Sequence, residues 1–291
     1  MPASFADRLS LSTCWCSHRH DDGYAMACEV RELGFARMEL SHGVPVSLVP
    51  GVLRALEEGV VSVSSVHNFC PLPVGISHAA PNLFEPSAKS RTEGARWARY
   101  TKRTVDFADR VGAAVVVLHS GSVPRRREGI LSFPPGRAGR EQAAMEAALR
   151  DPGSEAREEM LAKLERSSRP FLERVRSRFE ELAGYAAERG VALGVENREG
   201  WQELPLDGGL TDFFADFAPD SPLGYWHDTG HAEIKRRAGL LEPEILLESL
   251  SERLLGFHLH DVDESGRDHC APGTGSVDFD LIRQQVRPHH H

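Results

Sequence analysis

Short apolar runs alternate along the chain with longer stretches of helical periodicity. The apolar runs predict strands at 9–14, 36–40, 60–67, 113–119, 191–196, 223–228 and 254–260. The helical stretches are 22–33, 92–111 and 155–189, which includes Pro170, and a last helix begins near Asp278. Strands that alternate with helices predict βαβ units and a parallel sheet. The fold class is therefore α/β, and a chain of 291 residues suits one (β/α)8 TIM barrel.

We predict a single TIM-barrel domain over residues 1–291, in which the alternation is broken twice. Residues 120–153 are rich in Arg, Pro and Gly and predict an insertion after the fourth strand, on the catalytic face. This insertion is either a lid or a solvated excursion, and the sequence favours neither. Only seven strands are visible, so the eighth strand of the barrel is missing from this chain. The resulting open edge favours self-association, and a homo-oligomer is a further expectation.

Composition and charge exclude several classes of function. The formal net charge of −9 disfavours a nucleic-acid partner, and the five cysteines contain no Cys-x-x-Cys pair that would indicate a zinc finger. None of the four lysines ends a predicted strand, which argues against a Schiff-base aldolase. The chain contains no apolar run as long as a membrane span and no signal-peptide layout at its start, so a cytoplasmic location without a membrane partner is the default expectation.

Five of the predicted strands end with an acidic or imidazole side chain that faces the barrel lumen. Strand side chains alternate with period two, which places Asp228 inward and His227 and Leu255 outward. The inward strand-end residues are His67, His119, Glu196, Asp228, His258 and His260. A single buried histidine is usually structural, but buried carboxylates at this density call for a cation. Imidazole and carboxylate ligands suit a divalent ion, which could be Mn²⁺, Zn²⁺, Co²⁺, Fe²⁺ or Mg²⁺.

The same residues lie in motifs that resemble the xylose-isomerase-like TIM barrel superfamily. This superfamily includes sugar phosphate isomerases and epimerases and the zinc endonuclease that cuts abasic DNA. The matching segments are VHNFCP, LHSG, VEN, DTGH, HLHD and RDHCAPGTGSVDF, and the match runs from about residue 10 to residue 279. DTGH and DHxxPGxG are weak signals separately, but together, in this order and spacing, they are fairly specific.

The resemblance implies a metal site at the strand ends. Glu196 and Asp228 would be ligands, and the third ligand would be a histidine of HLHD, with His258 favoured and His260 still a candidate. Glu196 would also be the catalytic base, while His231 would contact substrate or bind a second metal. The family's fourth ligand is a glutamate on the eighth strand, and this sequence has no residue that matches it.

Other residues are assigned to a substrate pocket. The resemblance implies that Glu39, His67 and His119 bind substrate, and Asn197 is predicted to do so as the neighbour of Glu196. Trp15 lies near a strand end, where it either stacks on a sugar ring or packs at the rim.

Three functions are compatible with these residues. The leading hypothesis is a metal-dependent isomerase or epimerase that acts on a small sugar or related polyol. The alternative is a zinc-dependent phosphodiester hydrolase resembling the abasic-site endonuclease, with Asp268 and His269 as further metal ligands. These two residues are adjacent here, whereas one residue separates them in the endonuclease, which weakens this alternative. The third hypothesis is a truncated, non-catalytic barrel.

Overall fold

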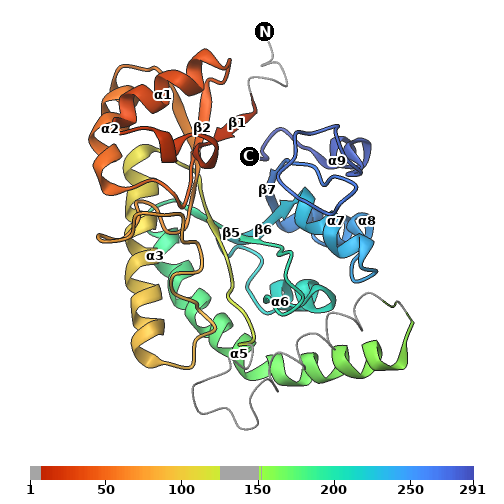
Figure 1. Ribbon diagram of the computed structural model, residues 1–291. Helices are drawn as coiled ribbons and strands as arrows, with labels where there is room; N and C mark the ends of the chain where they lie inside the picture. The colour runs from red at the N-terminus through yellow and green to blue at the C-terminus, as the bar shows by residue number, and fades with distance from the viewer. Residues whose placement is uncertain (1–7, 125–150, 152) are drawn as a thin grey trace, which may run out of the picture.

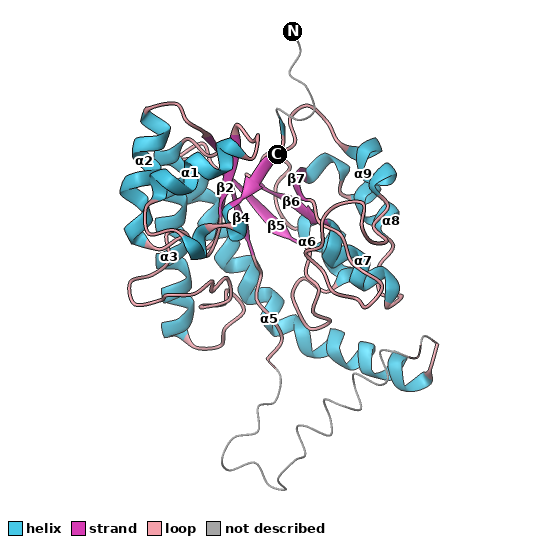
Figure 2. Ribbon diagram, turned by 45° about the horizontal axis from the view of Figure 1, so that its top comes forward, coloured by secondary structure: helices cyan, strands magenta, loops and turns pink. Residues whose placement is uncertain are grey.

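Seven parallel strands form one curled sheet whose spatial order follows the chain (Figures 1 and 2). The computed structural model describes residues 8–124, 151 and 153–291. The strands are β1 (Ser10–Ser12), β2 (Arg37–Leu40), β3 (Ser62–His67), β4 (Val115–Leu118), β5 (Ala192–Glu196), β6 (Leu223–Asp228) and β7 (Leu254–His258). Each predicted strand is present, and the fold is the partial (β/α)8 barrel that the sequence predicts.

Helices cover the outside of this sheet (Figure 2). They are α1 (Gly23–Glu32), α2 (Val49–Glu57), α3 (Arg91–Val111), α5 (Glu155–Ala187), α6 (Leu210–Ala215), α7 (Thr229–Arg237), α8 (Pro243–Ser249) and α9 (Phe279–Gln285). The helix α5 contains Pro170 and changes direction along its length, as expected when a proline removes one hydrogen bond of the helix (Figure 1). The sequence reasoning did not identify the short helices α2, α6, α7 and α8. None of the described helices is long and apolar enough to cross a membrane.

The inner face of the sheet is filled by side chains that the alternation rule places there. Val115, Val117 and Trp226 form a buried cluster in the lumen, as predicted. Leu255 also packs against this cluster, so the prediction that it faces the helices is wrong. The reason is a shift in the register of β6 and β7 between Tyr225 and Trp226, because such an irregularity interrupts the alternation.

Every predicted strand except the sixth is shorter in the structure, and the first and the last each end two residues earlier than predicted. Backbone pairing of β7 ends at His258, because β6 stops at Asp228 and the Thr229 hydroxyl then accepts from the His260 backbone N–H at 3.1 Å. The first strand ends at Ser12, whose side chain accepts from the backbone N–H of Cys14 and begins a 3-10 turn. Both shortened ends lie at the rim where the functional residues gather.

The strands β1 and β7 form the two edges of the sheet. Beside β7, His291 donates its backbone N–H to the Leu255 carbonyl and accepts from the Phe257 N–H, both at 2.9 Å. No eighth strand is found among the described residues. Most of the insertion predicted at 120–153 lies outside the described part of the chain.

Candidate metal centre

Three neighbouring strands bring an acidic or imidazole side chain to the same point. Glu196, Asp228 and His258 are the last residues of β5, β6 and β7, and one ligand atom of each lies within 4.8 Å of the others. His258 Nδ1 lies 2.7 Å from Glu196 Oε1 and 3.6 Å from Asp228 Oδ2. Both carboxylates are buried. Adjacent strands are about 4.8 Å apart, which explains why residues at matching heights converge.

His258 is oriented by Glu39, which comes from β2. Nε2 of His258 lies 3.1 Å from Glu39 Oε2, and the Glu39 carboxylate also accepts from Ser12 at 3.0 Å and from Ser65 at 2.8 Å. Burial opposes ionisation, but His258 outweighs it and lowers the pKa of Glu39 to about 2. Burial likewise opposes a charge on His258, yet Glu39 and Glu196 raise its pKa well above the usual range. The ring is thereby fixed with Nδ1 toward Glu196.

Two further histidines face the second oxygen of Glu196. His119 Nε2 lies 2.8 Å and His67 Nε2 lies 3.7 Å from Glu196 Oε2. The other ring nitrogen of each histidine has an oxygen partner, because Nδ1 of His119 lies 2.7 Å from Asn82 Oδ1 and Nδ1 of His67 lies 3.0 Å from the Asn68 carbonyl. Since Nδ1 donates to these oxygens, both Nε2 atoms carry lone pairs that point toward the carboxylate. Because both Nε2 atoms and the carboxylate oxygen are acceptors, they repel one another unless a positive charge lies nearby.

Arg198 supplies part of that charge, and the sequence reasoning missed it. Its Nη1 donates to Glu196 Oε2 at 3.0 Å, and its Nε donates to Glu203 at 3.1 Å. Burial and Arg198 together lower the pKa of His119 well below the usual range. Burial opposes ionisation of Glu196, but Arg198 and His258 hold its pKa well below the usual range. The only sequence signal for Arg198 is its position two residues after a predicted ligand, which gives the same lumen-facing parity.

Asp228 lies at the start of α7, where its carboxylate accepts several hydrogen bonds. It caps this helix by accepting from the His231 backbone N–H at 2.8 Å. His260 Nε2 lies 3.0 Å from Asp228 Oδ2, while Nδ1 of His260 accepts from the His269 backbone N–H at 3.0 Å. The hydrogen of His260 is therefore on Nε2, which donates it to Asp228. His231 Nδ1 lies 3.0 Å from the Asn197 carbonyl, which leaves its Nε2 facing the cluster.

Asn197, which is predicted to bind substrate, lies against Asp228 in the structure. Its side chain is 2% exposed and pairs with the backbone of Asp228, accepting from the N–H at 2.7 Å and donating to the carbonyl at 3.0 Å. The Tyr225 hydroxyl also donates to Asn197 Oδ1 at 3.1 Å. These contacts position the backbone of Asp228, and the role of Asn197 in substrate binding stays a prediction.

Further groups of possible ligands lie beside the first. The groups whose ligand atoms lie within 4.8 Å are His67–His119–Glu196, Asp228–His231–His260, Glu196–Asp228–His258 and Glu199–His231–Asp268. The predicted residue Asp268 thus joins the cluster through His231, with 3.9 Å between the two side chains.

The last two predicted residues lie nearer to solvent. The His269 ring stacks on His260 with centroids 4.2 Å apart, and its side chain is 69% exposed. Trp15 lies in the 3-10 turn after β1, is 60% exposed and carries the Arg19 guanidinium 5.5 Å from its ring. Neither residue belongs to the groups of possible ligands found among the described residues. The role of Trp15 in substrate binding stays a prediction.

A curled parallel sheet with carboxylates and imidazoles at its carboxyl end defines a partial TIM barrel with a candidate metal centre. Residues 29–289 match the xylose isomerase-like TIM barrel family, and the chain belongs to this family.

Solved structures are similar in fold. A D-tagatose 3-epimerase-like protein has a TM-score of 0.62 and 15% identity, over 95% of this chain and 85% of that chain. The 3-keto-D-glucoside 4-epimerase of E. coli has a TM-score of 0.63 and 15% identity, over 96% of this chain and 86% of that chain. An uncharacterized protein of Sinorhizobium fredii is 30% identical over 115 residues, which are 37% of this chain and 33% of that protein. The chain therefore spans about a third of this relative.

Proposed function

We propose that this protein is a metal-dependent isomerase or epimerase that acts on a sugar or related polyol. The observation that carries the proposal is the convergence of Glu196, Asp228 and His258 at the ends of three neighbouring strands, with ligand atoms within 4.8 Å. Membership of the family, and neighbours named as sugar epimerases, support the same class of reaction. Carboxylate and imidazole ligands suit Mn²⁺, Zn²⁺, Co²⁺, Fe²⁺ or Mg²⁺.

His258, and not His260, completes the proposed ligand set. Nδ1 of His258 faces both carboxylates while Nε2 pairs with Glu39, which is the usual arrangement of a metal-bound histidine. His260 accepts from His269 on Nδ1 and donates from Nε2 to Asp228, so neither ring nitrogen has a free lone pair. His260 is therefore assigned to holding Asp228.

The ionisation of the site supports a cation at this place. Burial opposes ionisation of Asp228, but His231 and His258 hold its pKa well below the usual range, as Arg198 and His258 do for Glu196. Both ligands are therefore already deprotonated at neutral pH, as metal binding requires. Only His258 has to lose a proton, and that proton comes from Nδ1.

We assign one ion to the Oε1 side of Glu196. The other oxygen, Oε2, already accepts from Arg198 at 3.0 Å and faces His119 Nε2 at 2.8 Å. A second divalent ion among Glu196, His67 and His119 would lie beside the Arg198 guanidinium, and charges of the same sign repel strongly at such short distances.

The proposed reaction is a proton transfer at a carbon next to a carbonyl group. A divalent ion held by Glu196, Asp228 and His258 would supply a Lewis acid for the sugar carbonyl, which makes the neighbouring C–H bond more acidic. Glu196 is proposed to accept this proton as the general base, and a proton from solvent then returns to the substrate, at the same carbon in an epimerisation or at the former carbonyl carbon in an isomerisation. Arg198 holds the Glu196 carboxylate by donating from Nη1, and Asn197 holds Asp228, so that both stay in position when substrate binds. His67 and His231 are proposed to orient substrate oxygens.

A sugar panel in D₂O tests this proposal. D-Tagatose, D-psicose, D-fructose and L-ribulose, which the neighbours' names supply, would be incubated with the full chain in Mn²⁺ or in EDTA. We expect stereochemical or aldose–ketose conversion in Mn²⁺, with deuterium at the reacting carbon, and neither in EDTA. Glu248→Gln is the matched control, because Glu248 is an exposed carboxylate that belongs to none of the groups of possible ligands found among the described residues. If the metal-loaded protein neither converts any sugar nor exchanges deuterium, the proposal is wrong.

Phosphodiester hydrolysis is the second candidate, because the groups of ligands lie side by side and share Glu196, Asp228 and His231. Three zinc ions per chain, together with incision of an abasic oligonucleotide, would favour this candidate. One ion per chain and no incision would favour the isomerase. The formal net charge of −9 weighs against a nucleic-acid substrate. Tight binding of either one or three ions per chain would contradict the hypothesis of a non-catalytic barrel.

A further inference from the structure

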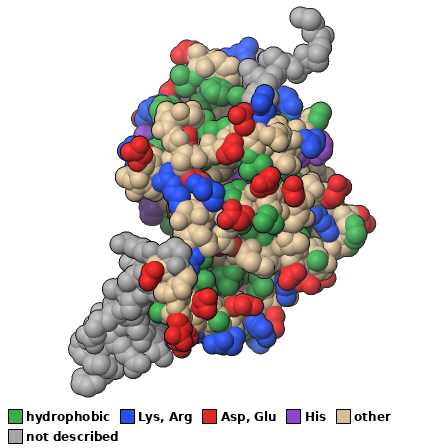
Figure 3. All heavy atoms as spheres, turned by 90° about the vertical axis from the view of Figure 1, so that its right-hand side faces the viewer, with side chains coloured by type: hydrophobic (Ala, Val, Ile, Leu, Met, Phe, Trp, Pro, Cys, Tyr) green, Lys and Arg blue, Asp and Glu red, His purple; other side chains and the backbone are tan. Residues whose placement is uncertain are grey.

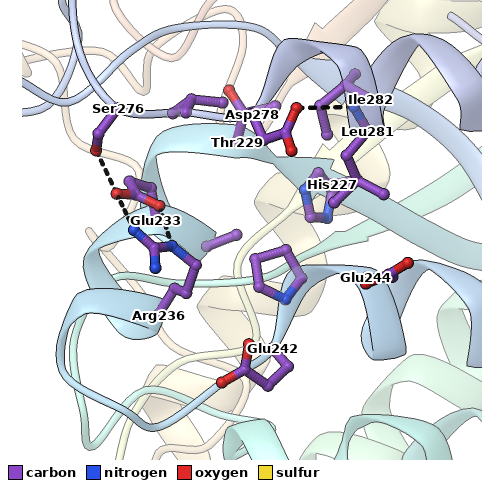
Figure 4. A pocket seen from close by; sticks show the side chains of 13 residues that line it. His227, Thr229, Glu233, Arg236, Glu242, Glu244, Ser276, Asp278, Leu281 and Ile282 are labelled. Carbon is purple, nitrogen blue, oxygen red and sulfur yellow. Dashed lines mark hydrogen bonds and ion pairs between the residues drawn. The ribbon is translucent and has the colours of Figure 1, made fainter.

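A cavity lies on the outer side of β6, where α7, α8 and α9 cover the end of the strand (Figure 4). Its volume is about 260 Å³, just below the range of roughly 300–1,000 Å³ of ligand pockets, so it suits a small ligand. His227 lines this cavity, while the next residue, Asp228, belongs to the metal centre. The two residues face opposite sides because side chains alternate along a strand. The proposed reaction makes no use of this cavity.

His227 presents a polar atom that lacks a partner. The side chain is 1% exposed, and within the described part of the chain its Nε2 has no hydrogen-bond partner. Tyr225 donates its single hydroxyl hydrogen to Asn197 Oδ1 at 3.1 Å, so His227 Nδ1, which lies 2.7 Å from the Tyr225 oxygen, must be the donor of that second bond. Nε2 is therefore an acceptor. A buried acceptor without a donor is costly, and a ligand that donates would remove the cost.

The charged groups around the cavity are mostly acidic. Glu233, Glu242, Glu244 and Asp278 line it, and Arg236 is the one cation among the lining residues. Arg236 is already paired with Glu233, by bonds of 2.6 Å and 2.9 Å. Acidic side chains are also numerous on the face of the molecule that carries these helices (Figure 3). An anionic ligand would meet an excess of negative charge here.

Two of these carboxylates are available to a ligand. Asp278 accepts from backbone N–H groups at the start of α9, and Glu233 is occupied by Arg236. Glu242 and Glu244 are exposed at the start of α8, and neither carboxylate has a hydrogen bond to any described residue. In Figure 4 both lie on the same side of the cavity, below His227. The remaining wall is apolar and consists of Ala232, Pro243, Val277, Leu281 and Ile282.

We propose that this cavity binds a small aliphatic amine in its ammonium form. An N–H of the ligand would donate to His227 Nε2, its positive charge would lie near Glu242 and Glu244, and its hydrocarbon part would contact the apolar wall. A metal ion is a poorer occupant, because no group of three ligand atoms within 4.8 Å is found here among the described residues. The combination of an acceptor, carboxylates without hydrogen bonds and apolar surface matches an alkylammonium ion, although Arg236 already attracts Glu242.

Buried hydrogen bonds connect this amine site to the proposed metal centre. His227 bonds to Tyr225 at 2.7 Å, Tyr225 to Asn197 at 3.1 Å, and the Asn197 amide to the Asp228 backbone N–H at 2.7 Å. A ligand that orders His227 therefore acts on the residue that positions Asp228. Any change that the amine causes in metal affinity must be matched by an equal change that the metal causes in amine affinity. This coupling rests on the proposed function, whereas amine binding itself does not.

Titration of the full chain with n-butylamine tests the binding. The side-chain ¹⁵N resonances of histidine would be followed by NMR, with 1-butanol and butyrate as the neutral and anionic ligands of similar size. We expect butylamine to shift the His227 Nε2 resonance and to bind at least tenfold more tightly than 1-butanol, and butyrate not to bind. Equal binding of amine and alcohol, or no shift of His227, would overturn the proposal.

Variants locate the ligand without relying on activity. The double change Glu242→Gln and Glu244→Gln affects exposed side chains, so the fold is retained, and we expect amine binding to weaken at least fivefold. Glu248→Gln, an exposed residue of α8 that does not line the cavity, is the matched control and should have no effect. Amine binding that is unchanged in the double variant would contradict the proposal. Glu196→Gln separates the two hypotheses, because it should lower kcat/KM for sugar conversion by about 10²–10⁴-fold and leave amine binding by the metal-free protein unchanged.

Discussion

The two sides of the β6 end differ in how completely their polar atoms are paired. On the inner side, Asp228 accepts from the His231 backbone and from His260, and its own backbone is held by Asn197. On the outer side, His227 is equally buried, but Nε2 has no partner among the described residues. Adjacent residues of one strand thus have opposite environments.

This difference separates a site whose ligand atoms are already held in position from one that has an unpaired buried acceptor. In the inner cluster every ring nitrogen that does not face a carboxylate bonds to another oxygen or N–H group, so the lone pairs are directed before an ion arrives. Such preorganisation lowers the cost of binding. The outer cavity instead leaves an acceptor to be satisfied by something from solvent. Changes on the inner side should therefore have much larger effects on activity than changes on the outer side.

The largest effect is expected from Glu196→Gln. The amide cannot accept a proton from substrate and is a weaker ligand than a carboxylate, so kcat/KM should fall by about 10²–10⁴-fold. Metal content measured on the same sample would show whether the loss reflects the ion or the base. Activity within about threefold of wild type would remove Glu196 from the proposed mechanism.

The next effect distinguishes two histidines of one segment. His258→Ala removes the proposed ligand and should abolish stoichiometric metal binding. His260→Ala removes the hydrogen bonds to Asp228 and to the His269 backbone N–H but no ligand, and should weaken metal binding by about 10–100-fold. Calorimetric titration with Mn²⁺ measures both. The reverse order of effects would identify His260 as the ligand.

Asn197→Ala should have a smaller effect on the metal and a clear effect on stability. The change leaves the buried N–H and carbonyl of Asp228 without their partner, which costs about 1–3 kcal/mol of unfolding free energy. Metal affinity should fall by about tenfold, because Asp228 is no longer fixed. Urea unfolding and metal titration of the same variant measure the two effects. An Asn197→Ala variant with wild-type stability would contradict this role.

The smallest effect concerns the pH dependence of the metal-free protein. The folded-state pKa of Glu39 is about 2, below the ordinary 4.5, so the unfolded chain binds the proton first as pH falls. Stability is therefore fully present above about pH 4.5 and is lost toward about pH 2. Between about pH 6 and about pH 3.5 the loss attributable to Glu39 is about 1 kcal/mol. Glu39→Gln should remove this part of the slope in urea unfolding, and an unchanged slope would contradict the shift.

The alternation of side chains along each strand was enough to predict which residues of β5 and β6 face the proposed metal centre. The parity of β5 and β6 placed Glu196 and Asp228 inward and His227 outward, because alternation holds wherever pairing is regular. The same rule was wrong for Leu255, because the register shift between β6 and β7 cannot be seen in one strand alone. The alternation rule also could not decide whether His258 or His260 is the metal ligand, because residues two positions apart face the same side of a strand.

The sequence by itself determined the α/β alternation, the family and the residue types at the carboxyl ends of the strands, since these depend on periodicity and local motifs. Only the tertiary structure decided which atoms face one another. The pairing of Asn197 with Asp228 and the cavity behind His227 arise from residues far apart along the chain or from opposite faces of one strand. Hydrogen-bond direction and burial depend on three-dimensional neighbours, and these assign the ring nitrogens on which the proposed chemistry depends.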